Sequence, residues 1–177
     1  SGLRQMIWHF EDPRVGHCYP NYYIAHLASH IVKVVLSGTG GDELFGGYPW
    51  RYANAVSSTF DGYINNYYSY WQRLINDSQK SRFFKPHVLE LTETSADSSN
   101  DSYTLSVFRS FFKSMVIDDI TSQVDACLYF ECKTFLHGLF LLEDKMSMAH
   151  SLETRVPLLD NNLVDLAMQV PADYKID

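Results

Sequence analysis

The feature that most constrains the fold is a short apolar run that ends in a glycine-rich turn. Residues 31–36 (IVKVVL) are mostly β-branched and show little alternation, which is typical of a strand buried on both faces. Apolar residues at helical spacing over 21–30 precede the run, and residues 37–48 (SGTGGDELFGGY) follow it, with Gly at four of the first ten positions. This order of helix, strand and turn predicts one step of a parallel α/β sheet.

Helical patterns dominate the rest of the chain. Further helices are predicted over residues 49–75, 104–117, 127–150 and 160–168. One apolar stripe with alternating spacings of four and three supports the longest of them: Leu128, Cys132, Phe135, Leu139, Leu142 and Met146. Asp160 or Asn161 is the expected N-cap of the last helix. The patterns together predict a helix-rich α/β fold.

The length of 177 residues fits one domain. Hydrophobic residues make up 46% of the chain and aromatic residues 15%, which excludes wholesale disorder. Residues 76–103 contain the polar, turn-forming stretch TSADSSNDS, which predicts an exposed loop within the domain rather than a linker between domains.

Charge, hydropathy and cysteine content exclude several classes of protein. The net charge is −7 and no run of Lys or Arg occurs, so we expect no nucleic-acid binding. No apolar run reaches 18 residues, so we expect no membrane span. The three cysteines, Cys18, Cys127 and Cys132, show neither disulfide nor zinc spacing, which indicates reduced thiols near the core of a cytoplasmic protein. The seven His lack the HExxH pattern, and none is assigned to a metal.

The glycine-rich turn predicts a binding site at the carboxyl edge of the sheet, where ligands of open α/β sheets bind. Glycines let backbone N–H groups approach a ligand. Asp42 and Glu43 follow at the start of the next helix, and a carboxylate there suits Mg²⁺ beside phosphates. A tight turn with an acidic cap and no ligand explains the glycine count equally well. The turn is neither a Walker loop nor a dinucleotide fingerprint.

Two stretches resemble motifs of the asparagine synthetase family: VVLSGTGGDELFGGY at 34–48 and LLEDKMSMAHSLETRVPLLD at 141–160. Their order and separation also fit the family, and the similarity runs from about residue 17 to the C-terminus, with 76–103 as the variable part. The resemblance implies part of a synthetase domain with an adenine-nucleotide-hydrolase-like parallel sheet, of the PP-loop ATP pyrophosphatase type.

The resemblance also implies an activity. In the family, ATP activates the carboxylate of aspartate as an acyl-adenylate and pyrophosphate leaves. Ammonia then attacks and gives the amide and AMP. Ammonia comes from glutamine through an N-terminal glutaminase domain. ATP and Mg²⁺ are the implied cofactors, and aspartate with ammonia are the implied small-molecule partners.

The resemblance assigns roles to residues of both motifs. The implied nucleotide-binding positions are Ser37, Gly38, Gly40 and Gly41. Asp42 matches a Mg²⁺ ligand, although a helix N-cap is an alternative role. Lys145 matches a lysine that contacts the phosphates, although a solvated helix lysine beside Asp144 is an alternative. Asp144 is expected to orient Lys145 or to cap the local turn.

Other motif positions are expected to be structural or to alter the substrate. Glu153 and Arg155 are interpreted as a buried ion pair that braces the site. Thr39 stands where asparagine synthetases often have Glu, a residue thought to contact the intermediate or to act as a base, and a threonine is no general base at neutral pH. A different carboxylate substrate, as in β-lactam-synthetase-like or sugar-acid-amidating enzymes, is therefore an alternative. A non-catalytic scaffold of the same fold is another.

The family's pyrophosphate loop, of the type Ser-Gly-Gly-x-Asp-Ser, and its glutaminase domain do not occur in residues 1–177. We therefore expect a fragment of a longer protein that is inactive by itself. A parallel sheet without its first strands has an unpaired edge. The expected consequence is either association between copies, as a homo-oligomer, or a compensating rearrangement.

Overall fold

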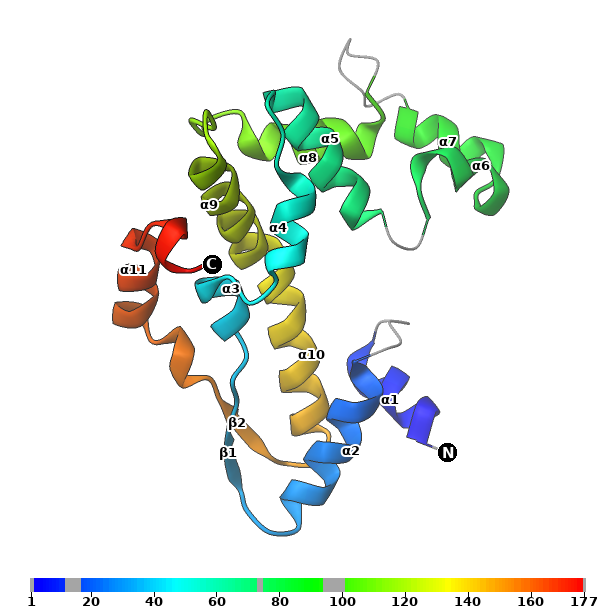
Figure 1. The fold of residues 1–177 in the computed structure, drawn as a ribbon. Helices are drawn as coiled ribbons and strands as arrows, with labels where there is room; N and C mark the ends of the chain where they lie inside the picture. Colours follow the sequence, from blue (N-terminus) through cyan, green and yellow to red (C-terminus); the bar gives the residue numbers. More distant parts are fainter. Residues whose placement is uncertain (1, 12–16, 73–74, 94–100, 177) are drawn as a thin grey trace. The chain divides into compact units, whose positions relative to one another are not determined.

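The computed structural model describes residues 2–11, 17–72, 75–93 and 101–176, and the chain divides into two compact units (Figure 1). The first, here called the strand unit, comprises Ser1–Gly47 and Phe130–Val170. The second, the helical unit, comprises Tyr48–Tyr129 and Pro171–Asp177. The sequence predicts part of one synthetase domain over residues 1–177, and both units fall within that range. The long stretch between Gly47 and Phe130 packs an aromatic core of its own.

The strand unit contains a parallel pair of strands, β1 (Val34–Leu36) and β2 (Glu153–Arg155), with Val34 opposite Glu153 and Leu36 opposite Arg155. Its helical elements are α1 (Gly2–Phe10), α2 (Cys18–Ser29), α3 (Gly41–Phe45), a π-helical turn η2 (Glu131–Phe135), α10 (Leu136–Met148), a 3₁₀ turn η3 (Pro157–Leu159) and α11 (Asn161–Gln169). The predicted step of helix, strand, turn and helix is confirmed by α2, β1 and α3. Strand β2 was not predicted, because three residues with alternating charge carry no strand pattern.

Strand β1 is largely exposed, and the prediction of a strand buried on both faces was wrong. Val34 is 40% exposed and Leu36 is 73% exposed. In the described part of the chain the sheet consists of β1 and β2, so β1 has a neighbour on one edge. An apolar β-branched run shows that a strand is suited to burial, but it does not show which segment provides the cover.

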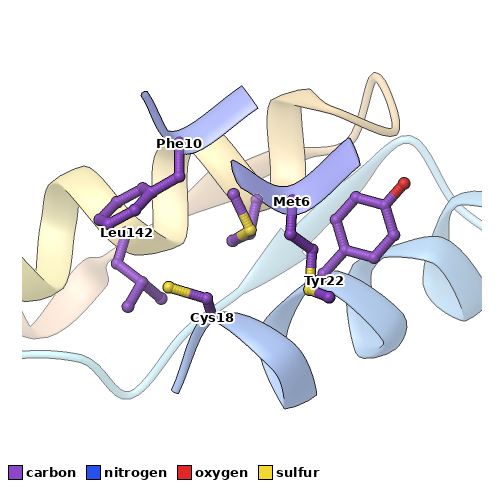
Figure 2. Packing of buried hydrophobic residues seen from close by; sticks show 6 residues of the cluster. Met6, Phe10, Cys18, Tyr22 and Leu142 are labelled. Carbon is purple, nitrogen blue, oxygen red and sulfur yellow. The ribbon is translucent and has the colours of Figure 1, made fainter. Parts of the chain in front are cut away.

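The core of the strand unit lies between α1, α2 and α10. Figure 2 shows Met6 and Phe10 from α1 directed towards Cys18 and Tyr22 from α2, with Leu142 of α10 beside them. Met146 completes this cluster one turn along α10 and is fully buried. Each such side chain stabilises the fold by about 1.5 to 3 kcal/mol on burial. The cluster therefore fixes the rotation of α10 about its axis.

The helical unit is built from α4 (Pro49–Ala55), α5 (Phe60–Trp71), η1 (Asp77–Gln79), α6 (Lys80–Phe83), α7 (Pro86–Glu93), α8 (Tyr103–Phe112), α9 (Ile120–Phe130, within the unit up to Tyr129) and η4 (Ala172–Tyr174). Its core is aromatic: Tyr63, Tyr67 and Phe112 are fully buried. The Tyr63 and Phe112 rings meet edge to face, with centroids 5.7 Å apart. The Tyr67 hydroxyl donates to the carbonyl of Cys127 at 3.3 Å, so a polar end is satisfied inside the core.

Most predicted helices are confirmed. Helices α4 and α5 lie within residues 49–75, and α8 covers most of 104–117. The long helical region runs from Ile120 to Met148 and contains the π-helical turn. Asp160 is the N-cap of α11, where its carboxylate accepts from the Asn162 backbone N–H at 3.0 Å. The three cysteines are free thiols, as expected.

The predicted loop over 76–103 was wrong for its first two thirds. Elements η1, α6 and α7 lie there. Asp77 holds this segment, because its carboxylate accepts from Tyr68 at 2.9 Å and from Ser102 at 2.6 Å and pairs with Lys80. Residues 94–100 of the predicted loop lie outside the described residues. Among the helices that the structure describes, none combines the length and the hydropathy that a membrane crossing requires.

Candidate active site

The candidate site lies in the strand unit, at the carboxyl end of β1 (Figure 1). The Ser37 backbone N–H donates to the Arg155 carbonyl at 2.8 Å, which extends the β1–β2 ladder by one bond. A turn follows, in which the Gly41 N–H donates to the Gly38 carbonyl at 3.2 Å. Helix α3 then begins, with Gly40 as its N-cap. The ladder and the turn together fix residues 37–41 relative to the sheet.

The glycines of this turn serve different purposes. Gly40 has φ of +94°, a conformation that other residues adopt only with strain. A Cβ on Gly40 would lie 2.5 Å from Leu159, and one on Gly41 would lie 2.9 Å from Leu158. Both glycines are thus required by the close approach of the turn Pro157–Leu159. At Gly38, by contrast, an added Cβ would have no heavy atom within 4 Å in the described chain apart from its neighbours Ser37 and Thr39, so this position has room for a ligand.

Two hydroxyls and a carboxylate meet at the strand end. The Thr39 hydroxyl donates to Oε2 of Glu143 at 2.5 Å. The hydroxyls of Ser37 and Thr39 are 3.0 Å apart. The Thr39 backbone N–H donates to Ser37 Oγ at 3.2 Å. A carboxylate from α10 therefore lies against Thr39 at the end of β1.

Sequence reasoning missed Glu143, which is 104 residues from Thr39. A local signal existed: Glu143 lies four residues after Leu139 and three before Met146, at the edge of the apolar stripe of α10. An acidic residue at the border of a buried stripe indicates that a polar partner lies nearby. The identity of that partner depends on tertiary packing, which the periodicity does not report.

Asp42 is the second residue of α3, and its carboxylate is exposed. The side chain lies against the backbone of Gly47, where a Cβ would come within 2.1 Å of the carboxylate oxygen. Gly40, not Asp42, is the N-cap of α3. The alternative role of Asp42 as a helix cap was therefore wrong, because the helix starts two residues earlier.

Lys145 faces α1 in this structure. Its ammonium forms an ion pair with Glu11 and donates to the Phe10 carbonyl at 3.2 Å. The hydrogen bond and the charge of Lys145 lower the pKa of Glu11 below its usual value. Lys145 is two residues after Glu143 on α10, a rotation of about 200°. Glu143 is turned to the strand end, whereas Lys145 contacts the last residue of α1, Phe10, and Glu11 directly after it.

Asp144 is exposed, and its carbonyl accepts from the Ser147 hydroxyl at 3.0 Å. The recorded carboxylate partner of Lys145 is Glu11, not Asp144. The pair Glu153–Arg155 forms as predicted, with a distance of 2.8 Å, but its side chains are 55% and 64% exposed. The prediction of a buried pair was wrong because β2, like β1, is uncovered. An exposed pair contributes little to stability.

The strand end has few groups that could hold a metal ion by themselves. No group of three or more His, Cys, Asp or Glu side chains in the described residues is arranged to hold a metal ion. Mg²⁺ beside phosphates needs only one or two carboxylates, since it keeps water and phosphate ligands. The exposed Asp42 carboxylate and the open space at Gly38 fit such an arrangement. The residues present are therefore compatible with a magnesium-bound phosphate.

A surface hollow of about 490 Å³ lies in the helical unit, lined in part by Met115, Asp125 and Tyr129. Burial raises the pKa of Asp125, and the charge of Lys175 opposes that rise. None of the predicted site residues lines this hollow. The strand end, which carries the predicted site residues, therefore remains the candidate site.

Comparison with known proteins identifies the family of the chain. The family model for asparagine synthase matches residues 1–177. Asparagine synthetase (glutamine-hydrolyzing) 1 of Bacillus subtilis is 29% identical, over 98% of this chain and 30% of the relative. Asparagine synthetase (glutamine-hydrolyzing) 3 of the same organism is 32% identical, over 81% of this chain and 21% of the relative. No solved structure matches the chain.

The chain thus spans about 30% of the length of the relative that matches 98% of it. The match of the family model extends over the two units alike. The β1 turn and helix α10, which supply Thr39 and Glu143, both lie within the matched residues. The chain belongs to the asparagine synthase family.

Proposed function

We propose that this chain is part of an ATP-dependent carbon–nitrogen ligase that converts aspartate to asparagine. ATP activates the substrate carboxylate as an acyl-adenylate with release of pyrophosphate, and ammonia derived from glutamine displaces AMP. The family membership of residues 1–177 supports this proposal, as do the relatives that are named glutamine-hydrolyzing asparagine synthetases.

The observation that carries the proposal is the arrangement at the carboxyl end of β1. Ser37, Gly38 and Thr39 leave a parallel strand there, Gly38 has open space beside it, and Glu143 holds the Thr39 hydroxyl. Ligands of parallel α/β sheets bind at this edge. We propose accordingly that β1 and β2 are part of a larger sheet of the PP-loop ATP pyrophosphatase type.

Each residue of the turn has a separate proposed role. The backbone of Ser37 and Gly38 contacts the nucleotide, whereas Gly40 and Gly41 keep the turn against Pro157–Leu159. Asp42 is the proposed Mg²⁺ ligand. The ion, when bound, supplies positive charge that offsets the phosphate charge beside Asp42 and Glu143.

Lys145 has a conditional role in this proposal. To contact the phosphates, its ammonium would exchange Glu11 and the Phe10 carbonyl for the nucleotide. Because Glu11 is highly exposed, that ion pair is a weak competitor. Asp144 adjoins Lys145 in α10 and is proposed to keep the exchanged lysine oriented.

The direct test is a pair of assays on the native protein that carries this chain. We expect exchange of pyrophosphate into ATP that depends on aspartate, and formation of asparagine from glutamine or from ammonium salts. Asp42→Asn should lower the exchange rate by about 100-fold, since it removes a magnesium ligand. Asp165→Asn is the control, because Asp165 is exposed on α11 of the same unit.

If ATP–pyrophosphate exchange depends on another carboxylate and not on aspartate, the proposed reaction stands and the proposed substrate is wrong. Absence of exchange with every carboxylate tried would refute the ligase proposal and favour a scaffold. We further propose that the isolated chain is inactive. Retained exchange by residues 1–177 alone would overturn that statement.

The exposed strand leads to a proposal about assembly. Leu36 is 73% exposed and Val34 is 40% exposed on β1, and uncovered apolar strands promote association. We propose that isolated copies of the chain associate through this strand in the cytoplasm of a producing cell. Light scattering should report a concentration-dependent mass, which Leu36→Lys lowers. A monomer at high concentration would contradict this proposal.

A further inference from the structure

The hydrogen bonds at the strand end have one consistent set of donors. A threonine hydroxyl has a single proton, and Thr39 donates it to Glu143 Oε2 at 2.5 Å. In the 3.0 Å contact between the two hydroxyls, Ser37 must therefore donate and Thr39 must accept. Ser37 Oγ in turn accepts from the Thr39 backbone N–H. The chain of bonds runs from Ser37 through Thr39 and ends on a carboxylate.

In this arrangement the Thr39 hydroxyl oxygen can accept one more hydrogen bond. A hydroxyl oxygen has two lone pairs, and the Ser37 hydroxyl occupies one of them. The neighbouring Gly38 has open space beside it in the described chain. A substrate atom that enters this space lies beside the residue that precedes Thr39 in the chain.

Glu143 is fixed well enough to receive a proton repeatedly. Leu142, which precedes Glu143, and Met146, three residues after it, are buried in the core between α1, α2 and α10, where Figure 2 labels Leu142. Glu143 itself is half-buried. A carboxylate carried on an anchored helix keeps its position when the ligand changes. A surface glutamate on a long free side chain would not.

We propose that, in amide formation, Thr39 passes a proton from the attacking nitrogen to Glu143. This inference rests on the proposed ligase function and assigns it a proton acceptor. Thr39 touches the reacting nitrogen, and Glu143 acts through Thr39. A threonine alone is too weakly basic for this task, but a threonine that donates to a carboxylate can accept one proton as it gives up another.

Amide formation exchanges one bond at the acyl carbon and releases one proton. The ammonia nitrogen bonds to the acyl carbon, and the bond between that carbon and the phosphate oxygen breaks, with its electron pair leaving on AMP. The nitrogen then carries one excess proton. That proton passes to Thr39 Oγ1 while the Thr39 hydroxyl proton passes to Glu143 Oε2. Water later takes the proton from Glu143.

The first half of the reaction needs no such acceptor. When the substrate carboxylate attacks the α-phosphorus, a carbon–oxygen–phosphorus link forms and pyrophosphate leaves, without loss of a proton from the nucleophile. Removal of the Glu143 charge should therefore slow amide formation much more than adenylation. A group that only supports the turn would affect both halves alike, because both use the same residues of the turn.

The experiment measures both halves on the native protein, with ammonium chloride as the nitrogen source so that glutamine hydrolysis is bypassed. Glu143→Gln keeps the size of the side chain and removes its charge. We expect amide formation to fall about 100-fold, and aspartate-dependent ATP–pyrophosphate exchange to change by less than about 3-fold. Glu143→Asp should recover part of the amide formation, and Asp165→Asn serves as the charge-matched control.

Thr39→Val provides an independent test, since it removes the hydroxyl and keeps the branched shape. It should reproduce the selective loss of amide formation, and Thr39→Ser should restore part of it. Equal losses in the two assays for Glu143→Gln, or full amide formation by Thr39→Val, would overturn the inference. If Glu143→Gln does not fold, the two assays on Thr39→Val test the inference instead. If the wild-type protein shows neither activity, the ligase proposal itself has failed, and the inference with it.

Discussion

The strand unit and the helical unit differ in how far their apolar side chains are buried. In the helical unit Tyr63, Tyr67 and Phe112 are fully buried, and rings from α5 and α8 pack on one another. In the strand unit Val34 and Leu36 of β1 are exposed, with Leu36 at 73%, and Val35 is half-buried. The helical unit thus completes its core locally, whereas one face of the sheet in the strand unit is left uncovered.

This difference suggests that the helical unit mainly supports stability, whereas the strand unit carries the reactive groups. An interior of large interlocked aromatic rings resists change, because each ring fills space that no neighbour can recover. The strand unit, by contrast, carries the exposed carboxylate of Asp42, the hydroxyl chain of Ser37 and Thr39, and the open position at Gly38. We therefore expect substitutions in the helical unit to reduce stability and those at the strand end to reduce activity.

The largest effect on stability is expected from Phe112→Ala. Phe112 is fully buried and contacts Tyr63 and Tyr67, and truncation of such a ring costs about 3 to 5 kcal/mol. Urea unfolding followed by tyrosine and tryptophan fluorescence would measure it. The matched apolar change on the strand, Leu36→Ala, should cost less than about 1 kcal/mol because Leu36 is already exposed. Equal costs would contradict the contrast between the units.

An intermediate effect is expected from Gly40→Ala within the strand unit. The φ of +94° and the contact with Leu159 should together cost about 2 to 3 kcal/mol. Gly38→Ala is the control and should stay within about 0.5 kcal/mol, since an added Cβ there meets open space. Thermal unfolding of the two variants gives the comparison. A larger loss for Gly38→Ala would show that the two glycines have been assigned the wrong purposes.

The smallest effect concerns acid stability of the helical unit. Burial alone would raise the pKa of Asp77, but bonds from Lys80, Ser102 and Tyr68 outweigh it and lower the pKa to about 2. A carboxyl with a lowered folded pKa stabilises the fold above its ordinary pKa of 3.8, and that contribution is lost as the pH falls towards 2.

Asp77→Asn should therefore cost about 1 kcal/mol at neutral pH, after allowance for solvent screening. It should also flatten the dependence of stability on pH between about 4 and 2. Urea unfolding at a series of pH values measures both quantities. Asp165→Asn, on an exposed part of α11, should change neither. An unchanged pH profile in Asp77→Asn would show that Asp77 does not stabilise the segment that follows α5.

Local patterns explain what the sequence could predict. The apolar run before Ser37 and the stripe through Leu142 and Met146 depend on residues a few positions apart, so β1 and α10 were both predicted. The N-cap at Asp160 is equally local and was confirmed. The glycine-rich turn located the candidate site at the end of β1 for the same reason.

Long-range packing explains what could not be predicted. The contact between Thr39 and Glu143 joins residues 104 positions apart, and no periodicity encodes it. The exposure of β1 and of the Glu153–Arg155 pair depends on which segments cover the sheet, which composition does not report. The first turn of the segment 77–93 was overlooked because bonds from Tyr68 and Ser102 to Asp77 hold it, rather than an apolar pattern.

The central claim, that nucleotide and substrate bind at the carboxyl end of β1, is tested most directly by hydrogen–deuterium exchange of the native protein with and without MgATP and aspartate. The account predicts slower exchange of backbone amides in residues 37–42 when the ligands are present, and little change in the aromatic helices α5 and α8. Slower exchange confined to the helical unit, with residues 37–42 unaffected, would contradict it.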